Sequence, residues 1–294
     1  MNRDKYVMSV SIQVKEALRE ASLFLATAGI TEPEANARLL LGHALALSPA
    51  SLLATQGELF PTERLASFEE AVNRKAEGEP AQYIIGEQEF YGLNFTVNSS
   101  VLIPRPETEL LVEAISNWGR KLWPRQSPLV ADIGTGSSAI AATLKHLNSD
   151  WRVMASDISP RALDVAKGNA AKLDLKIDFH EGNLLEPFTG LDLDILVSNP
   201  PYIPAADIED LQTEVRDYEP RSALDGGEDG LAPYRIMMQQ LPLLLAPPKL
   251  IGFELGMGQA EAVAELLRLA GHWSRIEVIK DYAGIDRHVL GITE

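Results

Sequence analysis

The sequence predicts an α/β fold in which a mostly parallel sheet carries helices on both faces, preceded by a small bundle of helices. From about residue 129 onward, short apolar runs alternate with segments of helical period, which is typical of a parallel sheet covered on both sides. Before residue 81 the apolar residues keep a helical spacing. We therefore expect a helical domain over residues 1–80, a β-hairpin linker over 81–105 and an α/β domain over 106–294.

Length and composition are those of a globular protein. The 294 residues are 46% hydrophobic and include no cysteine, which excludes disulfides, thiolate nucleophiles and cysteine-bound metals. The N-terminal residues lack the apolar core of a secretory signal, and no apolar run is long enough to span a bilayer. The formal net charge of −16 argues against affinity for a phosphate backbone. We expect a soluble cytoplasmic protein that does not bind nucleic acid directly.

Three helices are expected in the N-terminal domain. They are placed at Val14–Ala28, from residue 33 to Leu47, and from Pro61 to about Lys75. Gly29 ends the first, and Thr31, Pro33 and Glu34 have the pattern of an N-cap, a first-turn proline and a capping-box acid. His43 lies on the apolar stretch of the second helix, where a packed histidine is far commoner than a metal ligand.

From residue 81 to 103 the pattern changes to β. The strand-forming residues are those at 83–85, then Phe90, Tyr91, Phe95 and Val97, and with Gly86 and Gly92 as turn points they predict a hairpin that links two domains. In the segment that follows, two prolines fix the backbone around Arg105, and Pro106 can begin a helix that carries Leu110 to Ile115. The spacing leaves open whether this segment is a rigid elbow between domains or a wall of an active site.

Seven strands are expected in the α/β domain. They are placed at Leu129–Ala131, Val153–Ala155, Leu175–Phe179, Ile195–Ser198, Leu250–Leu255, Ile276–Ile279 and His288–Ile292. Helices are expected between them at residues 139–147, after the cap formed by Ser159 and Pro160, at 231–245 and at 263–270.

Chemically useful residues follow four successive strands. Gly134–Ser138, Asp157, Asn183 and Asn199 each stand at a carboxyl end, the edge of an open parallel sheet at which ligands bind. Glycines let a ligand approach the backbone and leave amides free at a helix start. Asp157 is spaced to bond a ribose diol, and we expect Asn183 and its neighbour Leu184 to border an adenine. The pattern predicts a site for a nucleoside cofactor.

The stretch Asn199-Pro200-Pro201-Tyr202 ends an apolar run abruptly. The side-chain oxygen of Asn199 and the carbonyl of Pro200 form a pair of acceptors that fits one NH₂ group, and Tyr202 offers a ring on which a planar group can stack. A dinucleotide-dependent dehydrogenase and a methyltransferase both fit the glycine-rich segment. No histidine stands at a strand end to relay a proton, and this corner favours transfer to nitrogen.

Longer motifs narrow the interpretation. Four further segments are informative: Leu102–Glu109, Glu214–Arg221, Ala223–Gly230 and Lys280–Arg287. They add to the Asp132-Ile-Gly-Thr-Gly strand end and to Asn199–Tyr202. Together they resemble the HemK/PrmC family, the peptide chain release factor glutamine N5-methyltransferases. The resemblance implies a class I, Rossmann-like fold with a seven-stranded sheet. It also implies methyl transfer from S-adenosylmethionine, leaving S-adenosylhomocysteine, to the glutamine of the Gly-Gly-Gln loop of release factors, a step linked to translation termination.

The resemblance also implies roles for individual residues. It places the cofactor against Gly134, Thr135, Gly136, Ser137, Ser138, Asp157, Asn183, Leu184 and Asn199. It assigns catalysis to Asn199, Pro200 and Tyr202, and substrate binding to these three with Pro201, Arg105 and Glu107. Ser138 stands where the family usually has a third glycine, and Asn183 where an acid is commoner. We expect no metal, release factors as partners, a monomer, and substrate recognition by the N-terminal helices.

Three alternatives stay open. A ribosomal protein glutamine methyltransferase shares the Asn-Pro-Pro-Tyr corner but differs around residues 104–108. An adenine-N6 nucleic-acid methyltransferase grips a flipped base with a similar corner, yet needs a basic track and usually a target-recognition domain, and neither is visible. A binding protein that has lost its chemistry would not need an intact Asn199–Tyr202 corner.

Overall fold

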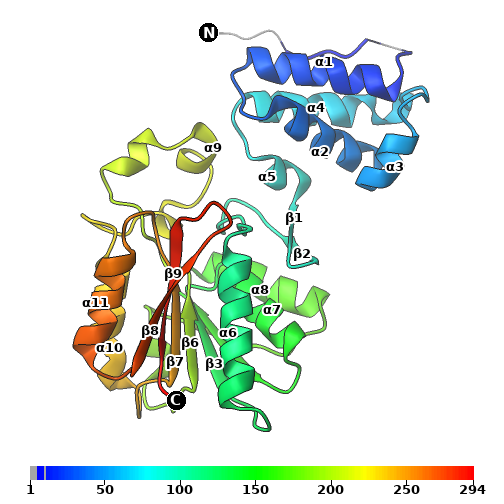
Figure 1. Cartoon of the computed structure of the whole chain (residues 1–294). Helices are drawn as coiled ribbons and strands as arrows, with labels where there is room; N and C mark the ends of the chain where they lie inside the picture. Colours follow the sequence, from blue (N-terminus) through cyan, green and yellow to red (C-terminus); the bar gives the residue numbers. More distant parts are fainter. Residues whose placement is uncertain (1–4, 10) are drawn as a thin grey trace. The chain divides into compact units, whose positions relative to one another are not determined.

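The computed structural model describes residues 5–9 and 11–294 (Figure 1). Its contacts divide the chain into two compact units, and each is described by itself. The helical unit comprises the described residues up to Gly86 together with Gln212–Tyr218, and the α/β unit comprises Glu87–Leu211 and Glu219–Glu294. No helix in the described part of the chain has the length and apolar character needed to cross a membrane.

The helical unit is built around one apolar core. Its helices are α1 (Val14–Thr27), α2 (Pro33–Leu45), α3 (Pro49–Ala54), α4 (Leu65–Ala76), α5 (Ala81–Ile85) and α9 (Thr213–Arg216), with a 3₁₀ turn η1 (Thr62–Arg64) before α4. Leu25, Leu40 and Phe68 are fully buried in this core, one each from α1, α2 and α4. The three predicted helices are confirmed, because each buries the apolar face that its spacing indicated.

Several local predictions in this unit are wrong. Glu32, in a left-handed conformation, is the N-cap of α2 and makes no side-chain cap, so Thr31 does not begin a capping box. Residues 83–85 belong to helix α5, which Pro80 precedes and Gly86 ends with a left-handed turn. The short helix α3 was not expected; the hydroxyl of Ser48 caps it by accepting from the Ser51 amide.

The segment Gln212–Tyr218 joins the helical unit although it lies far along the chain. Lys75 of α4 is almost completely buried, and its ammonium pairs with the carboxylate of Glu214 in α9. A buried charge is costly unless a partner satisfies it, so this pair ties α9 to α4. The predicted boundaries at residues 80 and 105 stay a proposal, since residues 81–86 group with the helices and residue 87 onward with the sheet.

The α/β unit contains the predicted seven-stranded, mostly parallel sheet, in the order β5-β4-β3-β6-β7-β9-β8. Figure 1 labels five of these strands, β3, β6, β7, β8 and β9. The strands are β3 (Leu129–Ile133), β4 (Arg152–Asp157), β5 (Asp178–Glu181), β6 (Ile195–Ser198), β7 (Leu250–Glu254), β8 (Arg275–Lys280) and β9 (Asp286–Ile292). β9 pairs antiparallel with both β7 and β8, and the other pairs are parallel. A separate hairpin of β1 (Glu87–Phe90) and β2 (Leu93–Thr96) confirms the second half of the predicted linker pattern.

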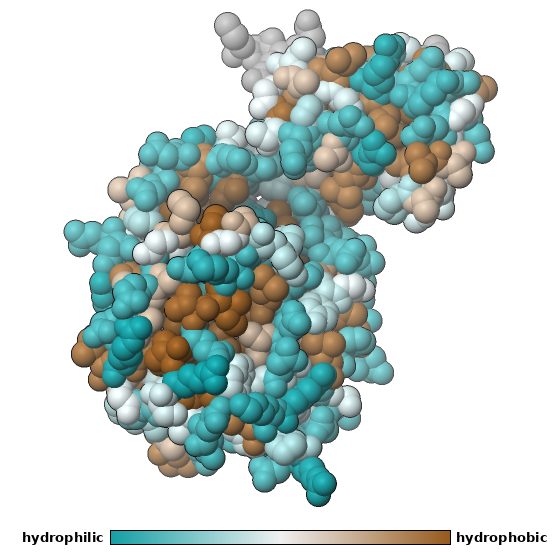
Figure 2. All heavy atoms as spheres, viewed as in Figure 1, coloured by the Kyte–Doolittle hydropathy of each residue, from teal (hydrophilic) through white to brown (hydrophobic). Residues whose placement is uncertain are grey.

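Helices cover both faces of this sheet. They are α6 (Thr108–Leu122), α7 (Ala139–Leu147), α8 (Pro160–Lys172), α10 (Ala232–Gln240) and α11 (Ala260–Ala270). Along β3, Val130 joins the core that contains residues of α6 and α7, whereas Ala131 and Ile133 join the core that contains residues of α10 and α11. Alternation of this kind requires a covered sheet. Apolar residues also gather over the closing strands β8 and β9, where Val278 is 43% exposed (Figure 2).

Candidate functional site

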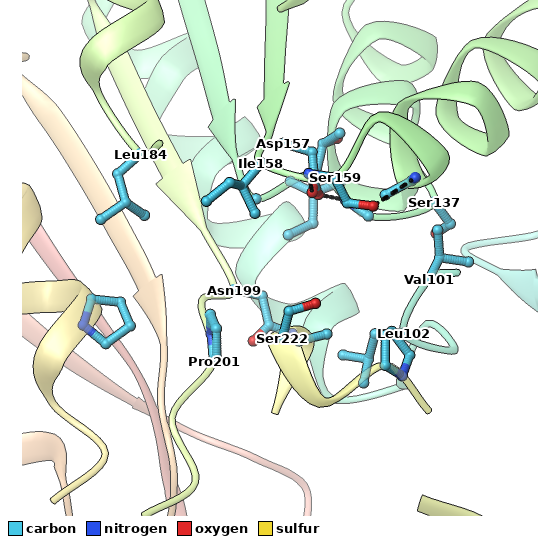
Figure 3. Close-up of a pocket in the computed structure, with 18 of the residues that line it drawn as sticks. Val101, Leu102, Ser137, Asp157, Ile158, Ser159, Leu184, Asn199, Pro201 and Ser222 are labelled. Atoms are coloured by element: carbon cyan, nitrogen blue, oxygen red, sulfur yellow. Dashed lines mark hydrogen bonds between the residues drawn. The ribbon is translucent and has the colours of Figure 1, made fainter. Parts of the chain in front are cut away.

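A cavity of about 480 Å³ lies in the α/β unit at the carboxyl ends of β3, β4 and β6 (Figure 3). Ten of the residues singled out from the sequence line it: Arg105, Gly134, Thr135, Gly136, Ser137, Asp157, Asn183, Leu184, Asn199 and Pro201. They come from loops that the sheet brings to one edge, as expected for an open parallel sheet. The predicted cofactor and transfer sites therefore share one cavity.

The loop between β3 and α7 forms one wall of the cavity. Gly134 and Gly136 have φ angles of 70° and 55°, in the left-handed region that glycine adopts without a steric penalty. The carboxylate of Asp157 accepts hydrogen bonds from the amides of Gly136 and Ser159, both at 2.9 Å. Burial raises the pKa of Asp157 above its usual value, while these amides oppose the shift. Asp157 thus fixes the glycine-rich loop and still presents a carboxylate to the cavity.

Ser138 is the third residue in the left-handed region of this loop, with φ of 69°. Its side chain is fully buried, does not line the cavity, and its hydroxyl has no hydrogen-bond partner among the described residues. A side chain in this conformation costs energy that glycine avoids. The backbone conformation at this position therefore favours glycine over serine.

Replacing Ser138 with glycine should raise the free energy of unfolding of the α/β unit by about 1 kcal/mol. The relief of backbone strain in the folded state exceeds the extra entropic cost of ordering a more flexible glycine. Tryptophan fluorescence during urea unfolding measures this unit selectively, since Trp118, Trp123, Trp151 and Trp273 all lie in it. Ser138→Ala is the control that removes the hydroxyl and keeps the strain. A glycine variant less stable than the alanine variant would contradict the prediction.

Asp132 is a buried acid to which the sequence interpretation assigned no role. Its Oδ2 accepts hydrogen bonds from the Thr135 hydroxyl at 2.6 Å and the Ala141 amide at 3.2 Å. Burial raises the pKa of Asp132 to about 7. It joins the loop to α7 from behind, so its contribution to the cavity is support. The signal was available, since the acid stands two residues before the first glycine.

At the corner after β6, Asn199 and Pro201 line the cavity, whereas Pro200 is buried (Figure 3). The Tyr202 side chain is partly buried in the core shared by α10 and α11 and is not on the cavity wall. Burial raises the pKa of Tyr202 to about 12, and its carbonyl accepts from Nε2 of Gln259 at 2.9 Å. The expected stacking of Tyr202 on a substrate stays a prediction that this packing does not support.

Arg105 lines the cavity, which favours the interpretation of its segment as a wall of an active site over that of a rigid elbow between domains. Its Nη2 donates to both carboxylate oxygens of Glu219, at 2.8 and 2.9 Å, and the Glu219 side chain is 1% exposed. Glu219 begins the loop that supplies Pro220 and Ser222 to the cavity. Arg105 therefore holds that loop in place, and Glu107, at the start of α6, does not line the cavity.

Apolar residues of the cavity were missed by the sequence interpretation. They are Phe90, Val101, Leu102, Ile140, Ile158 and Ile236. Most come from segments far apart in the chain, so no local pattern connects them. Ile158 had a signal, because it directly follows the strand-end acid, and it is 61% exposed. Within residues 5–9 and 11–294 no cluster of three histidine or acidic side chains could hold a metal ion.

The chain matches two family models, the PrmC N-terminal domain over residues 16–86 and the methyltransferase small domain over residues 106–215. It is also similar to proteins named release factor glutamine methyltransferase. The one from Moorella thermoacetica is 45% identical over 279 residues, covering 94% of this chain and 97% of the relative. The one from Bacillus subtilis is 42% identical over 280 residues, covering 94% and 96%. The similarity thus spans nearly the whole of each protein.

Among solved structures, the hMettl16 catalytic domain in complex with a MAT2A 3′UTR hairpin is similar with a TM-score of 0.53. It is 15% identical in sequence and covers 80% of this chain and 84% of its own. At this identity the likeness supports the methyltransferase fold alone.

Proposed function

The chain belongs to the release factor glutamine methyltransferase family, and from this we propose that it methylates the side-chain amide nitrogen, N5, of the glutamine in the Gly-Gly-Gln loop of peptide chain release factors. The observation that carries the proposal is the position of Asn199. It lines the same cavity as the glycine-rich loop and Asp157, so an amide held by Asn199 would lie beside a cofactor held by the loop.

We propose S-adenosylmethionine as the cofactor. The residues present fit it: two glycines in left-handed conformation leave open space where a Cβ would stand, and the Asp157 carboxylate suits a ribose diol. Leu184 offers an apolar contact to an adenine, with Asn183 beside it. When bound, the cofactor supplies a methyl group on a positively charged sulfonium. Thr135, Ser137 and buried Ser138 complete the loop around it.

The protein's task in the transfer is orientation. Amide resonance ties up the lone pair of a glutamine nitrogen, so this nitrogen is a poor nucleophile. We expect Asn199 Oδ1 and the Pro200 carbonyl to accept hydrogen bonds from its two N–H groups and so to aim the nitrogen at the methyl group. Alignment of reacting groups can lower a barrier by roughly 7 to 11 kcal/mol. The nitrogen becomes acidic as the methyl arrives, and water or a carbonyl can then accept the proton.

The partners that follow from this proposal are release factors, bound by a monomeric enzyme in the cytoplasm during translation termination. We propose that the predicted N-terminal helical domain, residues 1–80, recognises the substrate and that residues 106–294 carry the catalysis. The net charge of −16 supports a protein substrate over a nucleic acid, whose phosphates would be repelled.

Transfer of a radiolabelled methyl group tests the proposed substrate class. Purified release factor, ribosomal proteins and RNA are each incubated with the enzyme and labelled S-adenosylmethionine, and we expect label in the release factor. Label in a ribosomal protein alone would assign the chain to the sister glutamine methyltransferases. Label in RNA alone would contradict protein methylation.

A further inference from the structure

A line of buried polar side chains leads from the cavity into the sheet. It runs from Asn199 after β6, through Thr108 at the start of α6, to Glu254 at the end of β7, and His288 of β9 faces Glu254 in the strand register. The side chains of Thr108, Glu254 and His288 are buried, with relative exposures of 4%, 1% and 0%. A carboxylate in such a place is costly unless it is hydrogen-bonded.

In each hydrogen bond of this line, the chemistry of the groups determines which one donates and which one accepts. The Thr108 hydroxyl donates its one proton to Glu254 Oε2, at 2.6 Å. The same hydroxyl oxygen then has only lone pairs to offer Asn199. It accepts from Asn199 Nδ2 at 3.4 Å. The NH₂ branch of the Asn199 amide is thereby directed at Thr108, and the Oδ1 branch is the one left to face the cavity.

The direction matters because a side-chain amide can rotate and exchange its oxygen with its nitrogen. With Nδ2 facing the cavity, Asn199 would present donors to the donors of a glutamine amide. We propose that Thr108 and Glu254 are positioning residues, which fix the Asn199 amide with its oxygen toward the substrate; this inference rests on the proposed function.

His288 lies next to the Glu254 carboxylate but forms no hydrogen bond with it. Its Nε2 lies 3.7 Å from Glu254 Oε2, beyond hydrogen-bond distance, and neither ring nitrogen has a hydrogen-bond partner among the described residues. Tyr234 donates to the backbone carbonyl of Glu254 at 2.7 Å, not to its carboxylate. The described short hydrogen bond to this carboxylate is therefore the one from Thr108.

Thr108→Val keeps the shape of the side chain and removes the hydroxyl. We expect it to lower kcat by about tenfold, since small misplacements of an aligned group cost this much or more. Cofactor affinity by calorimetry should be unchanged, and Thr108→Ser should restore kcat to near the unsubstituted value. Thr143→Val in α7 is the matched control, because Thr143 is equally buried and its hydroxyl has no hydrogen-bond partner in the described structure.

Glu254→Gln is a second, independent variant. A glutamine amide can donate to the Thr108 oxygen. The Thr108 hydroxyl is then free to donate its proton to Asn199, so the Asn199 amide is no longer held with its nitrogen toward Thr108. We again expect kcat to fall by about tenfold with cofactor affinity unchanged. An unsubstituted enzyme without methyl transfer would refute the proposed function instead. With an active enzyme, normal kcat in Thr108→Val or Glu254→Gln, or a serine variant as slow as the valine variant, would overturn the positioning role.

Discussion

Replacing Asn199 with alanine should lower the rate of methyl transfer by about 10²-fold or more, the range seen when a single oriented polar group is removed from a reacting centre. The amide is the cavity-lining polar group of the corner, and Thr108 holds its nitrogen. Alanine leaves the substrate nitrogen without this acceptor. Single-turnover rates with saturating cofactor measure the loss directly.

Cofactor affinity separates this prediction from general damage to the cavity. The described contacts of Asn199 lead to Thr108 and not to the glycine-rich loop, so calorimetric affinity for S-adenosylmethionine should stay nearly intact. Asn199→Asp is the matched control, because it keeps the size and an acceptor oxygen but puts a second oxygen in place of the Nδ2 donor. Unchanged turnover in the alanine variant would remove Asn199 from the mechanism.

Replacing Asp157 with alanine should weaken cofactor binding by ~1.5 to 3 kcal/mol, as expected for the loss of a charged hydrogen bond. The structure adds a second reason. The same carboxylate holds the amides of Gly136 and Ser159 at 2.9 Å, so alanine also releases the glycine-rich loop. Isothermal titration calorimetry with S-adenosylmethionine measures the effect.

Asp157→Asn helps to separate the two contributions. Asparagine can still accept from one of these amides but carries no charge, so its affinity should fall between that of the unsubstituted protein and that of the alanine variant. Affinity unchanged in the alanine variant would place the ribose elsewhere in the cavity.

Short-range sequence patterns predicted the strands and the glycine-rich loop of the α/β unit well, because the residues within each pattern determine its local structure. In β3 the neighbours Val130 and Ala131 are both apolar yet enter different cores, and such a run requires a sheet covered on two faces. Gly134 and Gly136 likewise indicate a tight loop through their own backbone freedom. The edge of the sheet then brought ten of the predicted site residues into one cavity.

Patterns failed where the deciding partner lies far along the chain. Glu254 is separated from Thr108 by 146 residues, and its hydrogen bond leaves no local trace. Lys75 and Glu214, the pair that brings α9 to the helical unit, are 139 residues apart in the sequence. Residues 83–85 have strand-forming side chains, but Pro80 and Gly86 delimit one short helix there. In each case a tertiary or backbone constraint prevailed over local propensity.

Mass spectrometry of a release factor after incubation with the enzyme and S-adenosylmethionine shows whether the enzyme methylates the expected glutamine. Peptide mapping should show a gain of about 14 Da, one CH₂, on the glutamine of the Gly-Gly-Gln loop; the gain should be far smaller with the Asn199→Ala enzyme after the same short incubation, and absent with a Gly-Gly-Ala substrate. A release factor left unmodified by folded, cofactor-binding enzyme, or a gain on any other residue, would contradict methylation of this glutamine.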